Sequence, residues 1–154
     1  MKKPARDIDL RSARVIVACG AGVKTSEDFA FVKDLADCLG AQIAGTRPAV
    51  DRGFISREQM IGQTGVSVRP EVYIAIGISG STQHRSGLDE SATIIAVNRD
   101  RRAPIVSLAD HAIIGDLREV IPPMIEACRG GATIEQLIRS SAQGQSDGKL
   151  LHRQ

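Results

Sequence analysis

The amino-acid sequence predicts an α/β fold: a doubly wound, mostly parallel sheet with helices on both faces. Several short runs are apolar and rich in β-branched residues, a composition typical of strands that are covered on both sides. Amphipathic helical patterns and glycine-containing turns separate these runs. Such alternation is typical of βαβ units and therefore of a parallel sheet.

The first βα unit begins with a strand predicted at residues 14–19, RVIVAC. The helix that follows has a start signal, because Thr25 and Asp28 have the spacing of a capping box. Gly40 is placed as its C-terminal stop. Between these ends, apolar residues recur at i, i+3, i+4 and i+7, as expected for one buried helix face: Val32, Leu35, Ala36 and Leu39.

The second strand is predicted at residues 41–45, before a short helix. Pro48 fits the first turn of that helix, which we expect to run through Asp51 and to end at Gly53. Further central strands are predicted at 71–76, 93–97, 105–108 and 112–114.

A last helix is expected to open at Asp116. We expect its path to bend or restart at Pro122 and Pro123, because proline lacks an N–H donor and clashes with the preceding turn. The chain then divides into three parts: a flexible, charged N-terminal arm at 1–13, one domain at 14–129, and a partly disordered tail at 130–154. Residues 133–140 of the tail could form a short helix.

Charge and aromatic content argue against a nucleic-acid partner. The net charge is +2, but residues 1–14 hold five Lys/Arg against two Asp, so the rest of the chain is nearly neutral. The chain has three Phe, one Tyr and no Trp, and it has no basic stripe. It therefore lacks the basic surface that would neutralise a nucleic-acid backbone and the aromatic rings that would stack on bases.

The three cysteines, Cys19, Cys38 and Cys128, are odd in number, widely spaced and set among apolar residues. This pattern favours reduced core thiols over a disulfide framework or a zinc site, and it favours a cytoplasmic location. No apolar run approaches the roughly 20 residues that cross a bilayer, so no membrane insertion is expected.

Gly20 and Gly22 follow the first strand and precede a helix, as in a dinucleotide-binding turn, but the third glycine of that motif would fall on Thr25. The two glycines are explained equally well by the backbone needs of a tight turn. Arg47 follows the second strand, where an NADP-binding domain could place its 2′-phosphate arginine. A nicotinamide nucleotide therefore remains one alternative.

Residues 61–84 place two polar, glycine-containing loops around one apolar strand. The first loop, Gly62-Gln-Thr-Gly65, offers the amide of Gln63 and the hydroxyl of Thr64. The second, Gly77-Ile-Ser-Gly80, is a predicted strand-to-helix junction, where backbone N–H groups and the helix dipole favour an anion such as a diphosphate.

His84, next to Gln83, is compatible with contact to a planar heterocycle or with a surface or capping role. No Cys or second His lies at metal-ligand spacing around it, so no metal site is predicted. The second loop also lacks the last glycine of a G-x-S-x-G elbow, which disfavours a serine hydrolase. No catalytic residue is predicted.

Polar residues after the later strands have two interpretations each. Asn98 and Asp100 are suited to hydrogen bonds with ribose hydroxyls or to forming a turn. Asp116 is suited to capping the last helix, with Glu119 closing a capping box, or to facing a ribose.

Taken together, these motifs resemble the C-terminal FAD-binding domain of the electron transfer flavoprotein alpha subunit, a Rossmann-like nucleotide-binding domain. The resemblance covers about residues 14–128. The matching segments are LAD at 35–37, RPAVD at 47–51, GQTG at 62–65, PEVYIAIGISG at 70–80, QH at 83–84, AVN at 96–98 with Asp100, API at 103–105 and DL at 116–117.

The resemblance implies FAD as cofactor. It assigns to the isoalloxazine ring Arg47, Thr64 near N5 and His84 near the pyrimidine edge; a cation and donors there favour anionic reduced states of the ring. Ser79 would hold the diphosphate, and Asn98 and Asp116 the adenosine side. The full implied pocket is Thr46, Arg47, Ile61, Gly62, Gln63, Thr64, Ser79, Gly80, Ser81, Thr82, Gln83, His84, Asn98, Asp116 and Leu117.

The same resemblance implies an electron carrier that pairs with a beta subunit and accepts electrons from dehydrogenases. The chain departs from the family pattern in three ways. Ala21 stands where the family usually has an arginine in the first glycine loop, Arg85 replaces a residue that is usually apolar, and the family's N-terminal domain is not in this sequence. Two alternatives are an NADP-binding Rossmann-like domain and a non-redox module that binds an adenine nucleotide or nothing.

Overall fold

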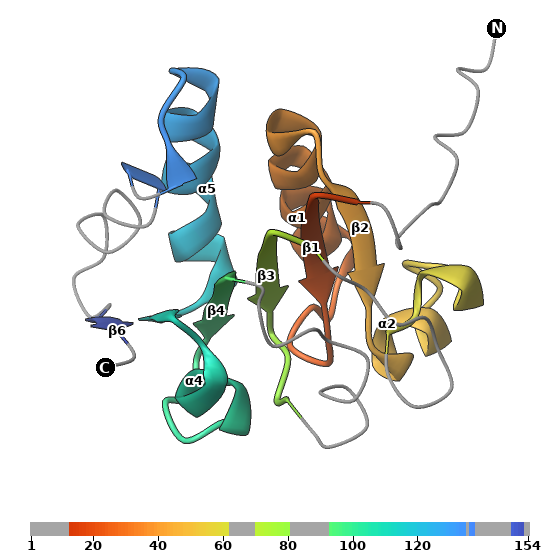
Figure 1. Ribbon diagram of the computed structural model, residues 1–154. Coiled ribbons are helices and arrows are strands. Elements are labelled where there is room, and N and C mark those ends of the chain that lie inside the picture. The colour runs from red at the N-terminus through yellow and green to blue at the C-terminus, as the bar shows by residue number, and fades with distance from the viewer. Residues whose placement is uncertain (1–12, 62–69, 81–92, 135, 138–148, 153–154) are drawn as a thin grey trace, which may run out of the picture.

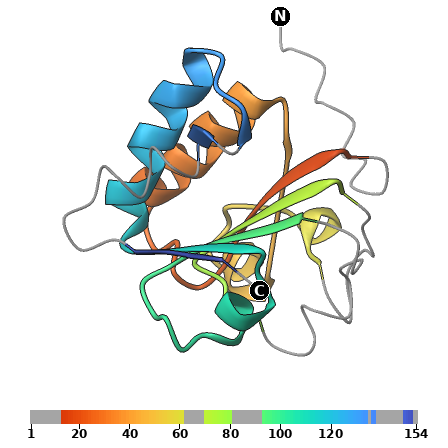
Figure 2. The same ribbon diagram turned by 60° about the vertical axis from the view of Figure 1, so that its left-hand side comes forward.

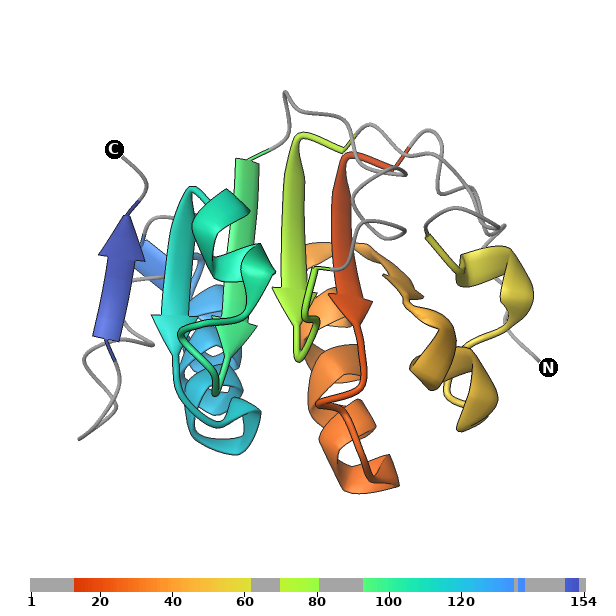
Figure 3. The ribbon, with the colours of Figure 1, turned by 90° about the horizontal axis from the view of Figure 1, so that it is seen from below.

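The computed structural model describes residues 13–61, 70–80, 93–134, 136–137 and 149–152. Its centre is a six-stranded sheet in the order β2-β1-β3-β4-β5-β6 (Figures 1 and 3). The first five strands run parallel, and the last is an antiparallel edge strand. Their bounds are β1 Val15–Cys19, β2 Gln42–Gly45, β3 Val72–Ile76, β4 Thr93–Asn98, β5 His111–Ile114 and β6 Lys149–His152.

The sheet is covered on both faces, which confirms the predicted doubly wound architecture. Helices α1 (Ser26–Leu39) and α5 (Leu117–Arg129) pack side by side on one face, and α4 (Pro104–Leu108) lies on the other (Figure 2). Alternate residues of β1 feed two separate cores: Val17 packs with α1 and α5, whereas Ile16 packs with α4. Burial on both sides explains why the central strands are continuously apolar.

Helix α1 begins and ends as its sequence predicts. The Thr25 hydroxyl accepts a hydrogen bond from the Asp28 amide at 3.1 Å, and the Asp28 carboxylate accepts one from the Thr25 amide at 3.3 Å. At the other end Gly40 takes the left-handed conformation, with φ 66°. Both terminal signals lie within the helix sequence itself and its caps, so they need no tertiary information.

The prediction of a strand at residues 105–108 is wrong. This segment is helix α4, with Pro104 in its first turn. The segment Ile-Val-Ser-Leu is too short to show a resolvable period, so it fits a short buried helix as well as a buried strand. Its backbone makes a helical hydrogen bond from the Ala109 amide to the Ile105 carbonyl at 2.9 Å. The Ile105 amide donates to the Ser79 carbonyl at 2.8 Å, which holds the segment against the loop that follows β3.

The predicted restart at Pro122 and Pro123 is also wrong, because α5 is one continuous helix. Proline in a helix interior costs about 3 kcal/mol. The helix also buries an apolar face at i, i+3, i+4, i+7 and i+8, and each such side chain contributes roughly 1.5–3 kcal/mol. Burial of five side chains against α1 and the sheet outweighs the lost hydrogen bonds: Leu117, Val120, Ile121, Met124 and Ile125.

The remaining elements lie close to their predicted places. Helix α2 (Arg47–Asp51) runs through Asp51 as expected, with its cap at Arg52 and the left-handed Gly53 (φ 80°) terminating it. A 3-10 turn, η1 (Arg57–Gln59), follows. In the tail, residues 134, 136 and 137 are helical, and the strand β6 was not predicted from the tail's polar composition. Residues 1–12 of the predicted arm lie outside the described residues.

The three cysteines are free thiols. Burial raises the pKa of Cys19 to about 12. Burial, with a contact to Cys38 from the neighbouring helix, raises the pKa of Cys128 to about 11. Thiols of this kind are protonated at neutral pH and therefore weak nucleophiles and metal ligands.

Candidate functional site

A cavity of about 260 Å³ lies at the carboxyl ends of β1, β3, β4 and β5. Figure 3 shows that the carboxyl ends of these strands lie on the same side of the sheet. Four turns, one after each strand, supply the walls. The lining residues are Ala21, Gly22, Lys24, Asp28, Gly77, Ser79, Val97, Asn98, Arg99, Asp100, Ala103, Gly115, Asp116, Leu117 and Arg118.

The cavity lies at the topological switch point of the sheet. The neighbours of β1 are β2 on one side and β3 on the other, so the chain leaves β1 and β3 toward opposite edges of the sheet. In open α/β sheets, ligands bind at the crevice that this divergence creates. The ligand site predicted at residues 77–80 therefore coincides with the crevice at the switch point.

The loop after β1, which contains Gly20 and Gly22, packs backbone to backbone against the loop after β3, which begins at Gly77. The Gly22 amide donates to the Gly77 carbonyl at 2.9 Å, and Gly77 has φ 65°. A Cβ on Gly77 would lie 2.8 Å from the Gly22 Cα, closer than atoms pack. Close packing therefore requires glycine at position 22 as well, where a Cβ would lie 2.8 Å from the Gly77 Cα, and Gly22 also lines the cavity.

Asn98 forms a turn, which is one of the two roles that the sequence suggests for it. Its amide nitrogen donates to the Ile78 carbonyl at 2.8 Å, and its oxygen accepts from the Asp100 amide at 2.9 Å. Asn98 thus ties the loop after β3 to the loop after β4. Because Asn98, Asp100 and the exposed Ser79 all line the cavity, this turn also sets where their polar groups face a ligand.

Asp116 is the N-cap of α5, as predicted, but the capping box with Glu119 is wrong. Its carboxylate accepts from the Arg118 amide at 2.9 Å, one residue before Glu119. Leu117 next to it is buried, with 7% of its surface exposed. Both residues line the cavity, so the pair predicted from the sequence reaches the site.

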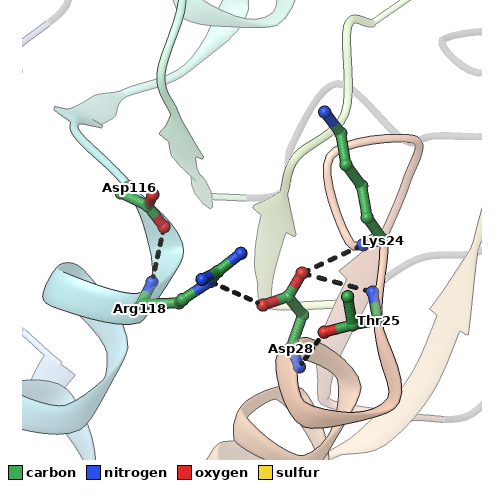
Figure 4. A network of polar contacts seen from close by, with 5 residues as sticks. All are labelled: Lys24, Thr25, Asp28, Asp116 and Arg118. Carbon is green, nitrogen blue, oxygen red and sulfur yellow. Dashed lines mark hydrogen bonds and ion pairs between the residues drawn. The ribbon is translucent and has the colours of Figure 1, made fainter.

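A buried carboxylate joins the two helices that flank the cavity. Asp28 of α1, with 3% of its side chain exposed, accepts from the Lys24 and Thr25 amides at 3.1 and 3.3 Å. Its other oxygen accepts from Arg118 Nε of α5 at 3.0 Å (Figure 4). Burial by itself would raise the pKa of Asp28, but the two amides and the guanidinium hold that pKa below its usual value.

A second unpredicted arginine fixes the first glycine loop from outside the cavity. Arg52 Nη1 donates to the carbonyls of Ala21 and Val23 at 2.7 and 2.8 Å. These contacts hold the turn whose Ala21 lines the site. Sequence motifs gave no signal for Arg52 or Arg118, because each acts through a contact between distant turns, and they identified Asp28 only as part of the capping box of α1.

Other predicted residues lie at the end of β2 and do not line this cavity. The Thr46 amide donates to the Cys19 carbonyl at 3.0 Å, and the Ile61 amide donates to the Gly45 carbonyl at 2.9 Å. Ile61 is buried, whereas Arg47 is exposed and forms an ion pair with Asp51 at 3.8 Å. The structure therefore brings Thr46 and Ile61 to the same sheet edge as the cavity.

The remaining predicted residues lie outside the described residues: Gly62, Gln63, Thr64, Ser81, Thr82, Gln83 and His84. Gly80 is described, with φ 84°, and a Cβ there would lie 2.7 Å from the Ile105 nitrogen. Close packing against α4 therefore requires glycine at this position.

The donor set of the cavity suits a phosphorylated nucleotide. Three cations line it, Lys24, Arg99 and Arg118, together with the Ser79 hydroxyl. Cations and hydroxyls bind phosphate oxygens, and the carboxylates Asp100 and Asp116 are suitable acceptors for ribose hydroxyls. The volume lies below the roughly 300–1,000 Å³ of complete ligand pockets, so this cavity fits part of a dinucleotide.

The fold and this cavity define a nucleotide-binding α/β domain. Comparison with known proteins narrows this class: residues 9–89, more than half of the chain, match the family model described as "Electron transfer flavoprotein FAD-binding domain". The chain belongs to this family, whose defined cofactor is FAD.

Relatives agree with the family. A FixB protein of Clostridium saccharobutylicum is 46% identical over 124 residues, which are 80% of this chain and 37% of that protein. A mitochondrial electron transfer flavoprotein alpha subunit of Dictyostelium discoideum is 45% identical over 129 residues, 84% of this chain and 36% of its own length. The alpha subunit of Mycobacterium tuberculosis is 48% identical over 115 residues, 75% and 36% respectively.

The chain therefore spans little more than a third of the length of these relatives. In the part of the chain that the structure describes, no helix combines the length and apolar character needed to cross a bilayer.

Proposed function

We propose that the chain is the FAD-binding domain of an electron carrier, which receives electrons from dehydrogenases and passes them to an acceptor. Bound FAD would supply the redox chemistry, since no side chain of the protein is itself a hydride or electron acceptor. The task of the protein is to hold the cofactor and to set the electrostatics around it.

The observation that carries this proposal is the cavity at the switch point between β1 and β3. It combines the place where α/β sheets bind nucleotides with three cations and, besides Asp28, the two carboxylates Asp100 and Asp116, a donor and acceptor set for phosphates and ribose. We assign Ser79 and Gly80 to the diphosphate, and Asn98, Asp116 and Leu117 to the adenosine side.

We assign the flavin ring to the carboxyl end of β2, on the same side of the sheet as the cavity. Thr46, Arg47 and Ile61 lie there, and the loop that begins at Ile61 leaves from the carboxyl end of β2. We extend the assignment to Gly62, Gln63 and Thr64, and to the segment Ser81, Thr82, Gln83 and His84. In this arrangement Arg47, Thr64 and His84 surround the ring and shift its potential.

A second subunit is part of this proposal. The named relatives are alpha subunits, and the chain matches only about a third of their length. A beta subunit, or an equivalent, would complete the ring side of the site, and dehydrogenases would be the electron donors.

The test is to titrate the purified chain with FAD and record its visible absorbance after gel filtration. Retained yellow colour, with shifted flavin bands, supports the proposal. A chain that stays colourless with excess FAD, alone and with a beta subunit, would contradict it.

The NADP alternative rested on Gly20, Gly22 and Arg47, and the position of Arg47 does not favour it. Arg47 does not line the cavity, and its guanidinium faces Asp51 on its own helix. NADPH binding that is lost in Arg47→Ala, without FAD binding, would revive it. Binding of ADP with no uptake of FAD would instead favour the non-redox module.

A further inference from the structure

Aspartate carboxylates take up part of the donor capacity where α1 and α5 start beside the cavity. At α1, the Lys24 and Thr25 amides, which precede the helix, donate to Asp28. At α5, the Arg118 amide donates to Asp116. Helix N-termini often bind phosphate through free backbone amides. Because these three amides are already bonded to carboxylates, side-chain cations are the charged donors that the cavity offers to a phosphate.

Three cations line the cavity, and one of them is held in place. Arg118 Nε is fixed to the buried Asp28 at 3.0 Å, whereas no side-chain hydrogen bond or ion pair within the described residues holds Lys24 or Arg99. Figure 4 shows the guanidinium of Arg118 extending from α5 toward the start of α1. The contact with Asp28 uses Nε, and no hydrogen bond within the described residues uses either Nη group.

An anchored guanidinium is the better phosphate ligand. It presents paired N–H donors in a plane that matches two phosphate oxygens, and it loses less side-chain freedom on binding than a free lysine. Its side chain is 63% exposed, so a ligand can reach it. The wall on the other side of the cavity has Ala21, which carries no charge.

We propose that Arg118, oriented by Asp28, binds the diphosphate of the cofactor. The inference rests on the proposed function, since it names a residue of the same site. Arg118 is the binding residue in this arrangement, and Asp28 is a positioning residue.

The experiment is calorimetric titration of the full 154-residue chain with ADP, adenosine and FAD. In Arg118→Ala, ADP and FAD should bind about 10- to 100-fold more weakly, the range expected for a charge-assisted hydrogen bond, and adenosine should bind as before. Arg129→Ala removes the same charge from the far end of α5 and should change none of the three affinities.

Two further variants keep the test sharp if Arg118→Ala folds poorly. Arg118→Lys retains the charge but not the paired donors, and it should recover only part of the ADP affinity. Ala21→Arg combined with Arg118→Ala restores a cation on the opposite wall and should recover part of the affinity for ADP but not change that for adenosine.

The outcomes separate the two proposals. Unchanged ADP binding in Arg118→Ala, or equal losses for ADP and adenosine, would overturn the role of Arg118 and leave the proposed function standing. A wild-type chain that binds neither FAD nor ADP would remove the proposed function, and the inference with it.

Discussion

The cavity and the carboxyl end of β2 lie on the same side of the sheet, but different kinds of contact hold them. The cavity is fixed by contacts between turns from four strands, including the buried Asp28 and the meeting of Gly22 with Gly77. At the carboxyl end of β2, the side chain of Arg47 is 79% exposed and forms an ion pair at 3.8 Å with Asp51, whose side chain is 65% exposed. Exposed pairs of this kind are worth little.

This contrast indicates which part of the proposed FAD site the chain can form by itself. The phosphate side depends on contacts that form as the sheet folds, so it should exist without a partner. The ring side requires residues beyond the described ones and, in our proposal, a second subunit. Mutations should therefore affect stability and ADP binding together at the cavity, and only flavin properties at the β2 end.

The largest effect is expected for Gly77→Ala. The new Cβ would face the Gly22 Cα at 2.8 Å, in a backbone conformation with φ 65° that side chains disfavour. Strain and overpacking together should lower the free energy of unfolding by about 2–5 kcal/mol, and ADP binding should be lost with it. Urea unfolding and calorimetry measure the two effects.

Gly131→Ala is the matched control for this variant. Gly131 has φ 85°, but nothing lies within 4 Å of an added Cβ. It should cost only the conformational part, about 1–2 kcal/mol, and leave ADP binding unchanged. Equal losses in the two variants would show that the contact between the glycine loops does not matter.

A smaller effect is expected for Asp28→Asn. The loss of a buried carboxylate with three donors should cost about 1.5–3 kcal/mol at pH 7 and weaken ADP binding by releasing Arg118. Because the folded-state pKa of Asp28 is lowered, its stabilisation is present above the unfolded pKa of about 3.9 and is lost as pH falls through the folded value.

Unfolding measured from pH 7 down to pH 2 tests this sign. The difference between the wild type and Asp28→Asn should shrink as the pH falls. Asp34→Asn, an exposed position on the same helix, serves as control and should change stability by less than about 0.5 kcal/mol. A difference that stays constant across this pH range would contradict the role of the Asp28 charge.

The parts of the fold that were predictable are the parts with local signals. The start and stop of α1 follow from Thr25, Asp28 and Gly40, and the parallel sheet follows from its apolar runs. The sequence could not separate helix from strand at 105–108, because four residues are too few to show a period. Helix α5 continues through two prolines because tertiary burial outweighs their cost.

The site was predictable to the same extent. Ser79, Asn98, Asp116 and Leu117 follow strands and could be placed at the edge of the sheet, and all four line the cavity. The Asp28–Arg118 contact could not be found this way, because it joins residues 90 apart in the chain and the capping box that contains Asp28 gives no sign of a distant partner. The pairing exists only once α1 and α5 are packed side by side.

The smallest structural effect, and the sharpest test of the contrast, is expected for Arg47→Ala. The pair with Asp51 is exposed on both sides, so the free energy of unfolding should change by less than about 0.5 kcal/mol, and ADP affinity should be unchanged. If Arg47 faces the flavin ring, the variant should lower the reduction potential of bound FAD, since a cation near the ring stabilises its anionic reduced state. Spectroelectrochemistry of the complex with its partner measures this. An ADP affinity that falls as far as in Arg118→Ala would show that the two ends of the sheet edge form one site rather than two.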